Sequence, residues 1–219
     1  MQVAPLPENE AQRLQTLRLY DILDTEPEKV FDDLTEASAK IFETPICLVS
    51  LVDEDRQWFK SAYGLDVRET ARDIAFCAHA ILSDDIFVVE DALFDHRFSD
   101  NPLVQDGPRI RFYAGAPLVT ADDSRLGTLC IIDTTPRAID PERLQILGAL
   151  RDAVASHLEL RRLARLSKQD PELIAVCAWC NGIRDEKGHD WVQPEEYLKR
   201  RHEVTHSICE KCRDEVLKQ

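Results

Sequence analysis

PICLVSLV, at residues 45–52, is followed by the acidic turn DED at residues 53–55 and by QWFKSAY at residues 57–63. A nearly unbroken apolar run of this length predicts a strand that is covered on both faces. The second run predicts another strand, and the short turn predicts that the two form a hairpin. Strands joined in this way pair antiparallel, so the stretch indicates an antiparallel sheet.

Three more strands are predicted further along the chain. Residues 110–119 and 126–133 are apolar runs joined by the turn ADDS at residues 121–124, and a shorter run lies at residues 86–90. Because most neighbouring strands are separated by short turns, we expect a largely antiparallel sheet.

Helices are predicted before, between and after these strands. One covers about residues 10–23, and TEPE at residues 25–28 has the T-x-x-E form of a capping box that opens a second helix. A short helix is predicted at residues 73–82. A long one runs from Pro141 to about residue 167, with apolar residues three and four apart. The order of elements therefore predicts an α+β fold.

The chain divides into three parts. Residues 1–9 contain two prolines and no periodicity, and they are predicted to be a flexible lead-in. Residues 10–167 hold the predicted strands and helices of one domain. The proline at position 171 ends the long helix, and residues 171–219 form a small module with four cysteines.

The composition excludes several functional classes. The 219 residues include 27 Lys+Arg and 41 Asp+Glu, which gives a net charge of −14 and predicts no binding to nucleic acid or to a membrane surface. The longest apolar run has seven residues, whereas a membrane span needs about 20. The first residues show no secretory signal, so a cytoplasmic location is expected. No glycine-rich phosphate-binding motif and no G-x-S-x-G motif is present.

Six blocks of the first domain resemble the GAF domain, in the branch found with bacterial histidine kinases and diguanylate cyclases. They occur in order between about residues 10 and 165. The blocks are ILDTEPEKVFDDLTEASAKIF, LVSLVDEDRQWFKSAYGL, FCAHAIL, FSDNPLV, IRFYAGAPL and LGTLCIID.

The resemblance implies a GAF-like three-layer α/β/α sensor domain with a central antiparallel sheet and a pocket for a small molecule or chromophore. Members of the family bind cyclic nucleotides, bilins, haem or metabolites, and they commonly dimerise through their first and last helices. No cysteine lies between Cys77 and Cys130, where bilin-binding relatives carry their attachment cysteine, so a covalent bilin is not expected.

Cys77 and His79, in FCAHAIL, are two residues apart on a predicted helix and do not share a face, so one of them points into the pocket in the functional interpretation. That residue would be a metal or haem ligand or a redox thiol. The alternative is that Phe76 and Cys77 are core and His79 is a hydrogen-bonded helix residue. The candidate ligand-binding residues are Trp58, Phe76, Cys77, His79, Arg111 and Tyr113.

The aromatic candidates on strands also have a simpler interpretation as core residues. Arg111 alternates in phase with Tyr113. It would bind an anionic ligand if that face is the pocket, and otherwise it is solvated.

The tail carries the pairs Cys177-x-x-Cys180 and Cys209-x-x-Cys212. Two such pairs supply the four tetrahedral ligands of a structural zinc site, which predicts a small zinc-ribbon-like module. An iron–sulfur site, a site with His206 as alternate ligand, and no metal are the alternatives. VCAWCNGIRDEKGHDWVQPEEYL…THSICEKC, at about residues 174–217, also resembles a cysteine-rich tail of bacterial PAS, GAF and receiver-domain proteins.

HEVTH, at residues 202–206, matches the H-E-x-x-H motif of zinc proteases. The motif reaches the cysteine at position 209 three residues later, and 13 residues remain after it, so we do not interpret it as catalytic.

These features predict a sensor in signal transduction and no enzyme. The sensor domain would bind a small molecule or sense redox state, and it would pass the signal to a protein partner, with the helix from Pro141 to about residue 167 pairing in a homodimer. One alternative is a thiol enzyme that resembles free methionine sulfoxide reductases and uses Cys47, Cys77 or Cys130. Because Cys47 and Cys130 lie in apolar strands, where thiols are usually inert, we prefer the sensor. The other alternative is a purely structural dimerisation module.

Overall fold

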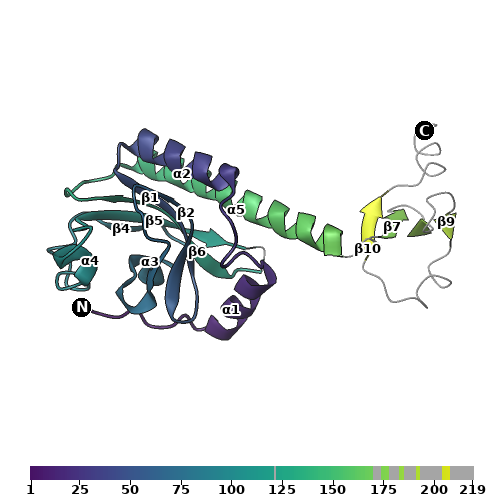
Figure 1. Ribbon diagram of the computed structural model, residues 1–219, viewed down its shortest axis with the longest axis horizontal. Coiled ribbons are helices and arrows are strands. Elements are labelled where there is room, and N and C mark those ends of the chain that lie inside the picture. The colour runs from purple at the N-terminus through teal and green to yellow at the C-terminus, as the bar shows by residue number, and fades with distance from the viewer. Residues whose placement is uncertain (121, 170–173, 178–182, 185–190, 193–203, 208–219) are drawn as a thin grey trace. The chain divides into compact units, whose positions relative to one another are not determined.

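The computed structural model describes residues 1–120, 122–169, 174–177, 183–184, 191–192 and 204–207 (Figure 1). The chain separates into two compact units, Met1–Arg162 and Leu163–Gln219, and each is described by itself.

The first unit is built on a six-stranded sheet in the order β3-β2-β1-β6-β5-β4, and every neighbouring pair is antiparallel. The predicted hairpin is its β1–β2 pair, and the predicted antiparallel sheet and α+β fold are confirmed. The strands are β1 (Ile46–Val52), β2 (Arg56–Tyr63), β3 (Glu69–Ala71), β4 (Phe87–Val89), β5 (Phe112–Val119) and β6 (Arg125–Asp133).

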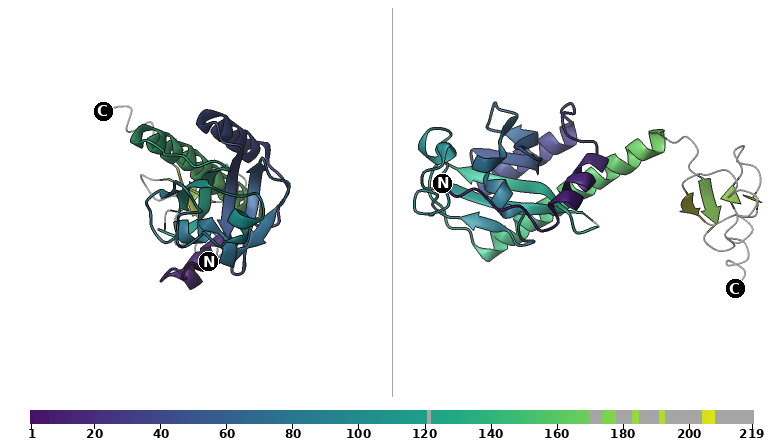
Figure 2. Two further views of the ribbon diagram at one scale, coloured as in Figure 1. Left: turned by 90° about the vertical axis from the view of Figure 1, so that its left-hand side faces the viewer. Right: turned by 90° about the horizontal axis from the view of Figure 1, so that it is seen from below.

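Long and short helices lie on opposite sides of this sheet. Figures 1 and 2 show the two long helices, α2 and α5, side by side on one side, with the short helices α3 and α4 on the other. The helical elements are α1 (Glu10–Leu19), α2 (Lys29–Phe42), the 3-10 turn η1 (Arg72–Ile74), α3 (Phe76–Ala80), α4 (Pro102–Gln105) and α5 (Pro141–Gln169). Among the described residues, no helix is long and apolar enough to cross a bilayer.

The predicted capping box is wrong. Glu28 is the N-cap residue of α2, but its side chain makes no capping hydrogen bond. Its Oε1 instead accepts hydrogen bonds from Lys60 Nζ at 2.7 Å and from Arg161 Nε at 2.7 Å. The hydroxyl of Thr25 donates to the carbonyl oxygen of Ile22. The threonine and glutamate of the T-x-x-E pattern therefore accept hydrogen bonds from the buried Lys60 and do not cap the helix.

The sheet separates two hydrophobic clusters, because successive side chains of a strand point to opposite faces. We call the side covered by α2 and α5 the closed face, and the side covered by α3 and α4 the cavity face. The closed-face cluster includes Phe31, Cys47, Leu129, Leu147 and Val154. The cavity-face cluster includes Leu48, Phe59, Phe76, Cys77 and Cys130.

Residues 1–9, which were expected to be a flexible lead-in, contact other residues of the first unit. The backbone N–H of Gln2 donates to the carbonyl oxygen of Arg97 at 2.9 Å, and Ala4 packs against the cavity-face cluster. The amino terminus forms an ion pair with Asp100. The segment shows no periodicity because contacts to residues far along the chain hold it, and not a helix or a sheet.

The described residues of the second unit form four short strands in the order β10-β7-β8-β9. They are β7 (Ile174–Cys177), β8 (Ile183–Arg184), β9 (Trp191–Val192) and β10 (Val204–Ser207), and β10 pairs parallel to β7. Because Val204–Ser207 is a strand, the end of HEVTH does not form the helix that a zinc protease needs. Of the predicted metal ligands, Cys180, Cys209 and Cys212 lie outside the described residues.

Candidate functional site

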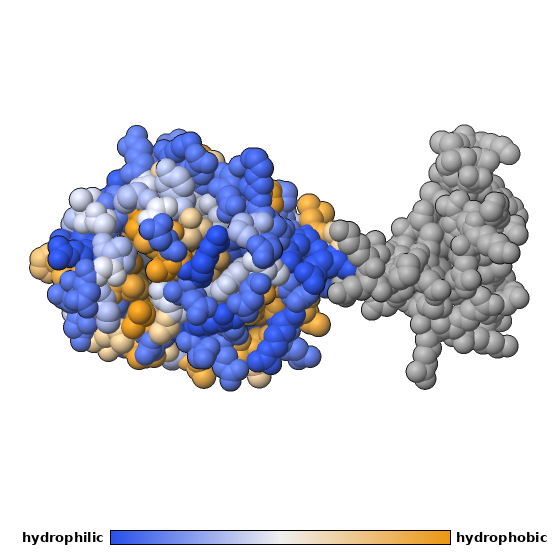
Figure 3. All heavy atoms as spheres, in the orientation of Figure 1, coloured by the Kyte–Doolittle hydropathy of each residue, from blue (hydrophilic) through white to orange (hydrophobic). Residues whose placement is uncertain are grey.

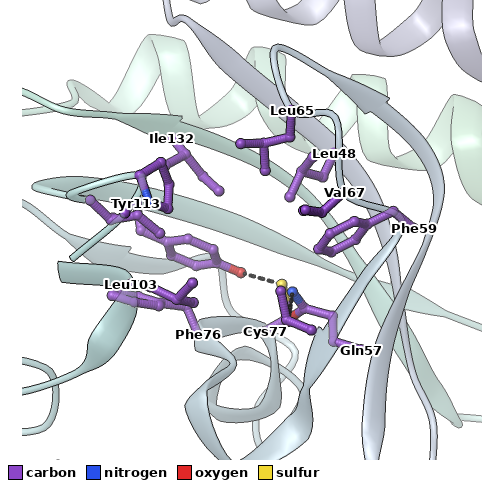
Figure 4. A pocket seen from close by; sticks show the side chains of 14 residues that line it. Leu48, Gln57, Phe59, Leu65, Val67, Phe76, Cys77, Leu103, Tyr113 and Ile132 are labelled. Atoms are coloured by element: carbon purple, nitrogen blue, oxygen red, sulfur yellow. Dashed lines mark hydrogen bonds between the residues drawn. The ribbon is translucent and has the colours of Figure 1, made fainter. Parts of the chain in front are cut away.

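A cavity of about 270 Å³ lies within the cavity face of the first unit (Figure 4). Its inner walls come from β1, β2, β5 and β6, which contribute Leu48, Phe59, Tyr113 and Ile132. Its other walls come from α3 and from the segments 65–70 and 103–110. Two long helices cover the closed face, whereas short helices and loops cover this face and surround the cavity. In Figure 3 the surface over α2 is hydrophilic, and apolar residues come to the surface on the side of α3 and α4.

Gln57, on β2, places a buried polar group in the wall of the cavity. Gln57 is 4% exposed, and its Nε2 donates a hydrogen bond to the hydroxyl of Thr70 at 3.4 Å. Its Oε1 has no hydrogen-bond partner among the described residues. A buried acceptor without a partner costs about 1–3 kcal/mol, so a ligand that donates a hydrogen bond here would recover that free energy.

Cys77, at the start of α3, is the second polar feature of the cavity wall. Its Sγ accepts hydrogen bonds from Tyr113 Oη at 3.2 Å and from Thr128 Oγ1 at 3.1 Å (Figure 4 shows the first). The Sγ of Cys130 lies 4.0 Å away. Cys77 and Cys130 are fully buried free cysteines, and they are 53 residues apart in the sequence.

The surroundings give the three cysteines of this unit different acidities. Burial opposes ionisation of Cys77, but hydrogen bonds from Cys130, Thr128 and Tyr113 outweigh it and lower the Cys77 pKa to about 7. Burial and the neighbouring Cys77 sulfur raise the pKa of Cys130 well above its usual value. Burial raises the pKa of Cys47, on the closed face, to about 12. Cys77 is therefore the thiol of this unit that ionises most readily.

Tyr113 is held over the backbone of its own strand. A Cβ atom at Gly115 would lie 2.2 Å from the Tyr113 hydroxyl, so the ring keeps this position only because residue 115 is glycine. This close approach lets the hydroxyl reach the Cys77 sulfur. The burial of Tyr113 raises its pKa well above the usual value, and the phenol remains a neutral donor.

Three of the six predicted ligand-binding residues line the cavity, namely Phe76, Cys77 and Tyr113. The ring of Phe76 also stacks on Phe98 with 3.9 Å between the ring centroids. Residues of α3 and β5, which are more than 30 residues apart in the sequence, thus line the same cavity.

Trp58 lies on the opposite side of the sheet, in the closed-face cluster. On β2 it alternates with Gln57 and Phe59, both of which line the cavity. Both aromatic residues could line a pocket from their sequence, and only Trp58 was kept as a candidate, whereas Phe59 is the one that lines this cavity. Gln57 and Phe59 are two residues apart on the strand and therefore point to the same face, whereas Trp58 between them points to the other.

His79 and Arg111 also lie outside the cavity lining. His79 is 8% exposed, its Nε2 lies 3.1 Å from the carbonyl oxygen of Gln2, and burial lowers its pKa. The guanidinium of Arg111 donates two hydrogen bonds to the Asp91 carboxylate, at 2.7 and 2.6 Å. His79 thus has the helix role of the simpler interpretation, and Arg111 is a partly exposed ion-pair residue.

The residues that line the cavity carry no charged side chain. Sequence reasoning missed Gln57 and Leu103, because neither belongs to a residue type or motif that indicates a site. The arrangement can bind a small apolar molecule, offer one unpaired acceptor to it, and expose one acidic thiol to it.

Comparison with known proteins supports a single family for the first unit. The family model described as GAF domain matches residues 26–158. A cyclic di-GMP phosphodiesterase of Pseudomonas aeruginosa is 48% identical over 143 residues, which make up 65% of this chain and 24% of that protein. The chain thus spans about a quarter of the length of this curated relative.

Two solved structures show the same fold at low identity. The GAF domain of an Acinetobacter phosphoenolpyruvate-protein phosphotransferase is 16% identical with a TM-score of 0.51, and the match covers 71% of this chain and 97% of that domain. The GAF domain of PixJ from Thermosynechococcus elongatus is 16% identical with a TM-score of 0.50, and the match covers 75% of this chain and 95% of that domain.

The Pseudomonas relative corrects one expectation of the sequence analysis. The chain was expected not to be an enzyme, whereas the relative that is 48% identical is named as one. The expectation failed because it relied on recognising catalytic motifs. The matched part of the relative is about a quarter of it, and a family of domains can occur within enzymes without carrying such motifs.

Proposed function

This chain belongs to the GAF domain family, and from that membership we propose that its first unit binds a small apolar molecule and thereby regulates the hydrolysis of cyclic di-GMP. The observation that carries the proposal is the cavity of about 270 Å³ with the unpaired Gln57 Oε1 in its wall. Nearly all the remaining lining is apolar, as in most small-molecule sites.

The chemistry of the lining defines the ligand class. A molecule with an apolar ring or short chain fills the space between Leu48, Phe59 and Tyr113, and one N–H or O–H donor pairs with Gln57 Oε1. Phosphate groups are recognised by arginine, lysine or clustered N–H donors, and the lining has no cationic side chain. The ligand is therefore an input signal, distinct from the cyclic dinucleotide.

The regulated reaction is proposed from the Pseudomonas relative, which is named a cyclic di-GMP phosphodiesterase. The signal passes through α5 to phosphodiesterase machinery, and a homodimer through this helix is part of the proposal. Leu160 and Leu163 support it, because they lie three residues apart on α5 and are 59% and 49% exposed. A cytoplasmic location fits this role and stays a prediction.

Pairs of small aromatic molecules that differ by one donor test the ligand class. Indole and indene are one pair, and phenol and toluene are another. We expect indole and phenol to bind the full chain about tenfold more tightly than their partners, because only they satisfy Gln57 Oε1. Titration calorimetry measures the affinities.

Gln57→Met is the matched variant, since it keeps the length of the side chain and removes the acceptor. It should abolish the preference for indole over indene while both still bind. If none of the four molecules binds at millimolar concentration, or if the preference survives in Gln57→Met, the proposed ligand class is wrong.

We also propose that the tail holds a structural zinc ion through Cys177, Cys180, Cys209 and Cys212, with His206 as alternate ligand. The backbone supports it, since Ser207 lies opposite Cys177 in the parallel β7–β10 pair. One C-x-x-C pair begins at the end of β7, and the other begins two residues after β10. Both pairs therefore start from the same edge of the small sheet, and four thiolates suit zinc.

Elemental mass spectrometry of the purified chain tests this site. We expect about one zinc ion per chain, and none in the Cys177→Ser, Cys180→Ser double variant. Iron in place of zinc, or zinc that remains in the double variant, would overturn the assignment.

A further inference from the structure

We propose that Cys77 and Cys130 are a redox pair that is oxidised to a disulfide by a small organic hydroperoxide entering the cavity. The inference rests on the proposed function, because the oxidant uses the same cavity as the apolar ligand. It assigns a reactive site to two buried cysteines that the binding of an apolar ligand does not require.

The positions of the two sulfur atoms give them different roles. Cys77 belongs to the lining of the cavity, whereas Cys130 does not. Both residues are almost fully buried, and their sulfur atoms lie 4.0 Å apart. Cys77 therefore reacts with the oxidant, and Cys130 resolves the product.

Hydrogen-bond donors favour the reactive form of Cys77. The thiolate is the nucleophile in thiol oxidation, and Tyr113 and Thr128 both direct hydroxyl groups at this sulfur, at 3.2 and 3.1 Å. Such donors stabilise a negative charge on sulfur inside an otherwise apolar site. Cys130 lacks an equal share of donors and stays a neutral thiol.

The reaction balances with the hydroperoxide as the only oxidant. The Cys77 thiolate attacks the terminal oxygen of ROOH, the S–O bond forms, and the O–O bond breaks with its electron pair leaving on RO⁻. Protonation by solvent gives ROH. The Cys130 sulfur then attacks the sulfenic sulfur, the S–S bond forms, and hydroxide leaves with the Cys130 proton as water. Two thiols are thus oxidised, and one hydroperoxide is reduced to an alcohol and water.

The lining determines which hydroperoxide fits. Leu48, Phe59 and Phe76 offer apolar surface to the carbon chain of ROOH, which hydrogen peroxide lacks. Cys47 provides an internal control, because it is equally buried but lies on the closed face, away from this cavity.

Oxidation would also change the cavity. The sulfur atoms must approach from 4.0 Å to about 2.05 Å, which draws α3 toward β6. Tyr113 and Thr128 at the same time lose their thiolate acceptor. Oxidation of Cys77 and binding of an apolar ligand would therefore affect the same lining residues of the cavity, Cys77 and Tyr113.

The test uses the reduced full chain, one equivalent of cumene hydroperoxide, and peptide mapping. Trypsin places the three cysteines of the first unit in separate peptides, residues 41–56, 73–97 and 126–137. We expect a cross-linked pair of the second and third peptides with the loss of two hydrogen atoms, while the first peptide stays reduced. Cumene hydroperoxide should react about tenfold faster than hydrogen peroxide.

Two variants separate the steps. In Cys130→Ser, Cys77 should stop at the sulfenic acid, gain one oxygen atom and react with dimedone. Tyr113→Phe keeps the ring and removes one donor, and it should slow oxidation of Cys77 about tenfold. Circular dichroism of each variant shows whether the fold is retained. If Cys130→Ser does not fold, the cross-link in the unmodified chain and the rate in Tyr113→Phe still decide the question.

The inference is wrong if Cys77 is oxidised no faster than Cys47, or if oxidised Cys77 is found without a link to Cys130. Indole binding in the same sample distinguishes the two proposals. Indole binding without oxidation of Cys77 overturns the redox pair alone, whereas failure of both overturns the use of the cavity.

Discussion

The closed face and the cavity face of the sheet share the same strands and differ in what covers them. Two long helices cover the closed face, where Phe31 and Cys47 are 0% exposed in a continuous core. Short helices and loops cover the cavity face, where Phe59 is as well buried but borders a cavity of about 270 Å³. The two faces therefore differ in the buried polar groups beside their apolar residues, because Gln57 and Cys77 lie in the lining of the cavity on the second face.

Thiol chemistry follows the same division. Burial raises the pKa of Cys47 to about 12 although Ser38 hydrogen-bonds to its thiol, whereas the sulfur of Cys77 receives hydrogen bonds from the hydroxyl groups of both Tyr113 and Thr128. Burial is nearly equal for the two residues. The larger number of side-chain hydrogen bonds to Cys77, and not its exposure, is therefore what makes this cysteine a candidate reactive group.

The largest expected effect is on the closed face. We expect Phe31→Ala to lower the free energy of unfolding by about 4 kcal/mol, because a well-packed core cannot refill the volume that the ring leaves. Phe59→Ala should cost about 3 kcal/mol, since one side of its ring already borders empty space. Urea denaturation followed by circular dichroism measures both values. Equal losses, or a larger one for Phe59→Ala, would remove the distinction between the faces.

Glu10 connects the two sides of the unit. It lies on α1, whose Leu17 belongs to the closed-face cluster, and it accepts hydrogen bonds from buried Arg13 at 2.8 Å and from Arg72 of η1 at 2.6 Å. Burial raises the pKa of Glu10, but the two guanidinium groups outweigh burial and lower it from 4.5 to about 2. The group is thus charged in the folded protein at pH values where it is protonated in the unfolded chain.

The sign of the pH dependence follows from that lowered pKa. The stabilisation is complete above pH 4.5 and is lost as the pH falls toward about 2. We expect Glu10→Gln to cost about 3 kcal/mol at neutral pH and to remove a matching part of the acid sensitivity. Denaturant titrations between pH 2 and pH 7 check this. An unchanged slope for Glu10→Gln would show that other carboxylates govern acid unfolding.

Gly115→Ala tests the packing of Tyr113 on the cavity face. The new methyl group would lie 2.2 Å from the Tyr113 hydroxyl, so the ring must move away from Cys77. We expect a stability loss of about 2 kcal/mol and slower alkylation of Cys77 by iodoacetamide at neutral pH.

Gly148→Ala is the control for this substitution. It lies on α5 with nothing within 4 Å of the added atom, so it should keep or slightly raise stability and leave Cys77 unchanged. Equal alkylation rates in the two variants would disprove the role of the glycine at position 115.

The smallest effect is expected at Arg111. Its ion pair with Asp91 is partly exposed, so Arg111→Met should change the free energy of unfolding by about 0.5 kcal/mol. Indole binding should not change, because Arg111 does not line the cavity. Loss of binding would restore the sequence prediction that this residue contacts the ligand.

Most of the fold was predictable because the central strands are long and apolar. The hairpin of β1 and β2 follows from one continuous run and one charged turn. β3 and α4 were missed, since elements of three and four residues show no periodicity. The capping box was misread because Glu28 pairs with Lys60, which the sequence places 32 residues away.

The site was less predictable, because it depends on the order of strands. Phe76, Cys77 and Tyr113 were found from local composition and resemblance. The approach of Cys77 to Cys130 requires knowing that β6 lies beneath α3, and no local pattern contains that information. Trp58 and Phe59 are adjacent apolar residues on opposite faces, so hydrophobicity alone does not separate them.

Because successive side chains of β6 point to opposite faces, this strand connects the cavity face with the closed face. Cys130 touches the cavity cysteine, and the residues bonded to it on either side, Leu129 and Ile131, belong to the same cluster as Leu147 and Val154 of α5. Whatever displaces Cys130 must rotate or shift the peptide planes that carry its two neighbours. Cys130, beside the cavity, is therefore separated by a single peptide bond from residues that share a cluster with α5.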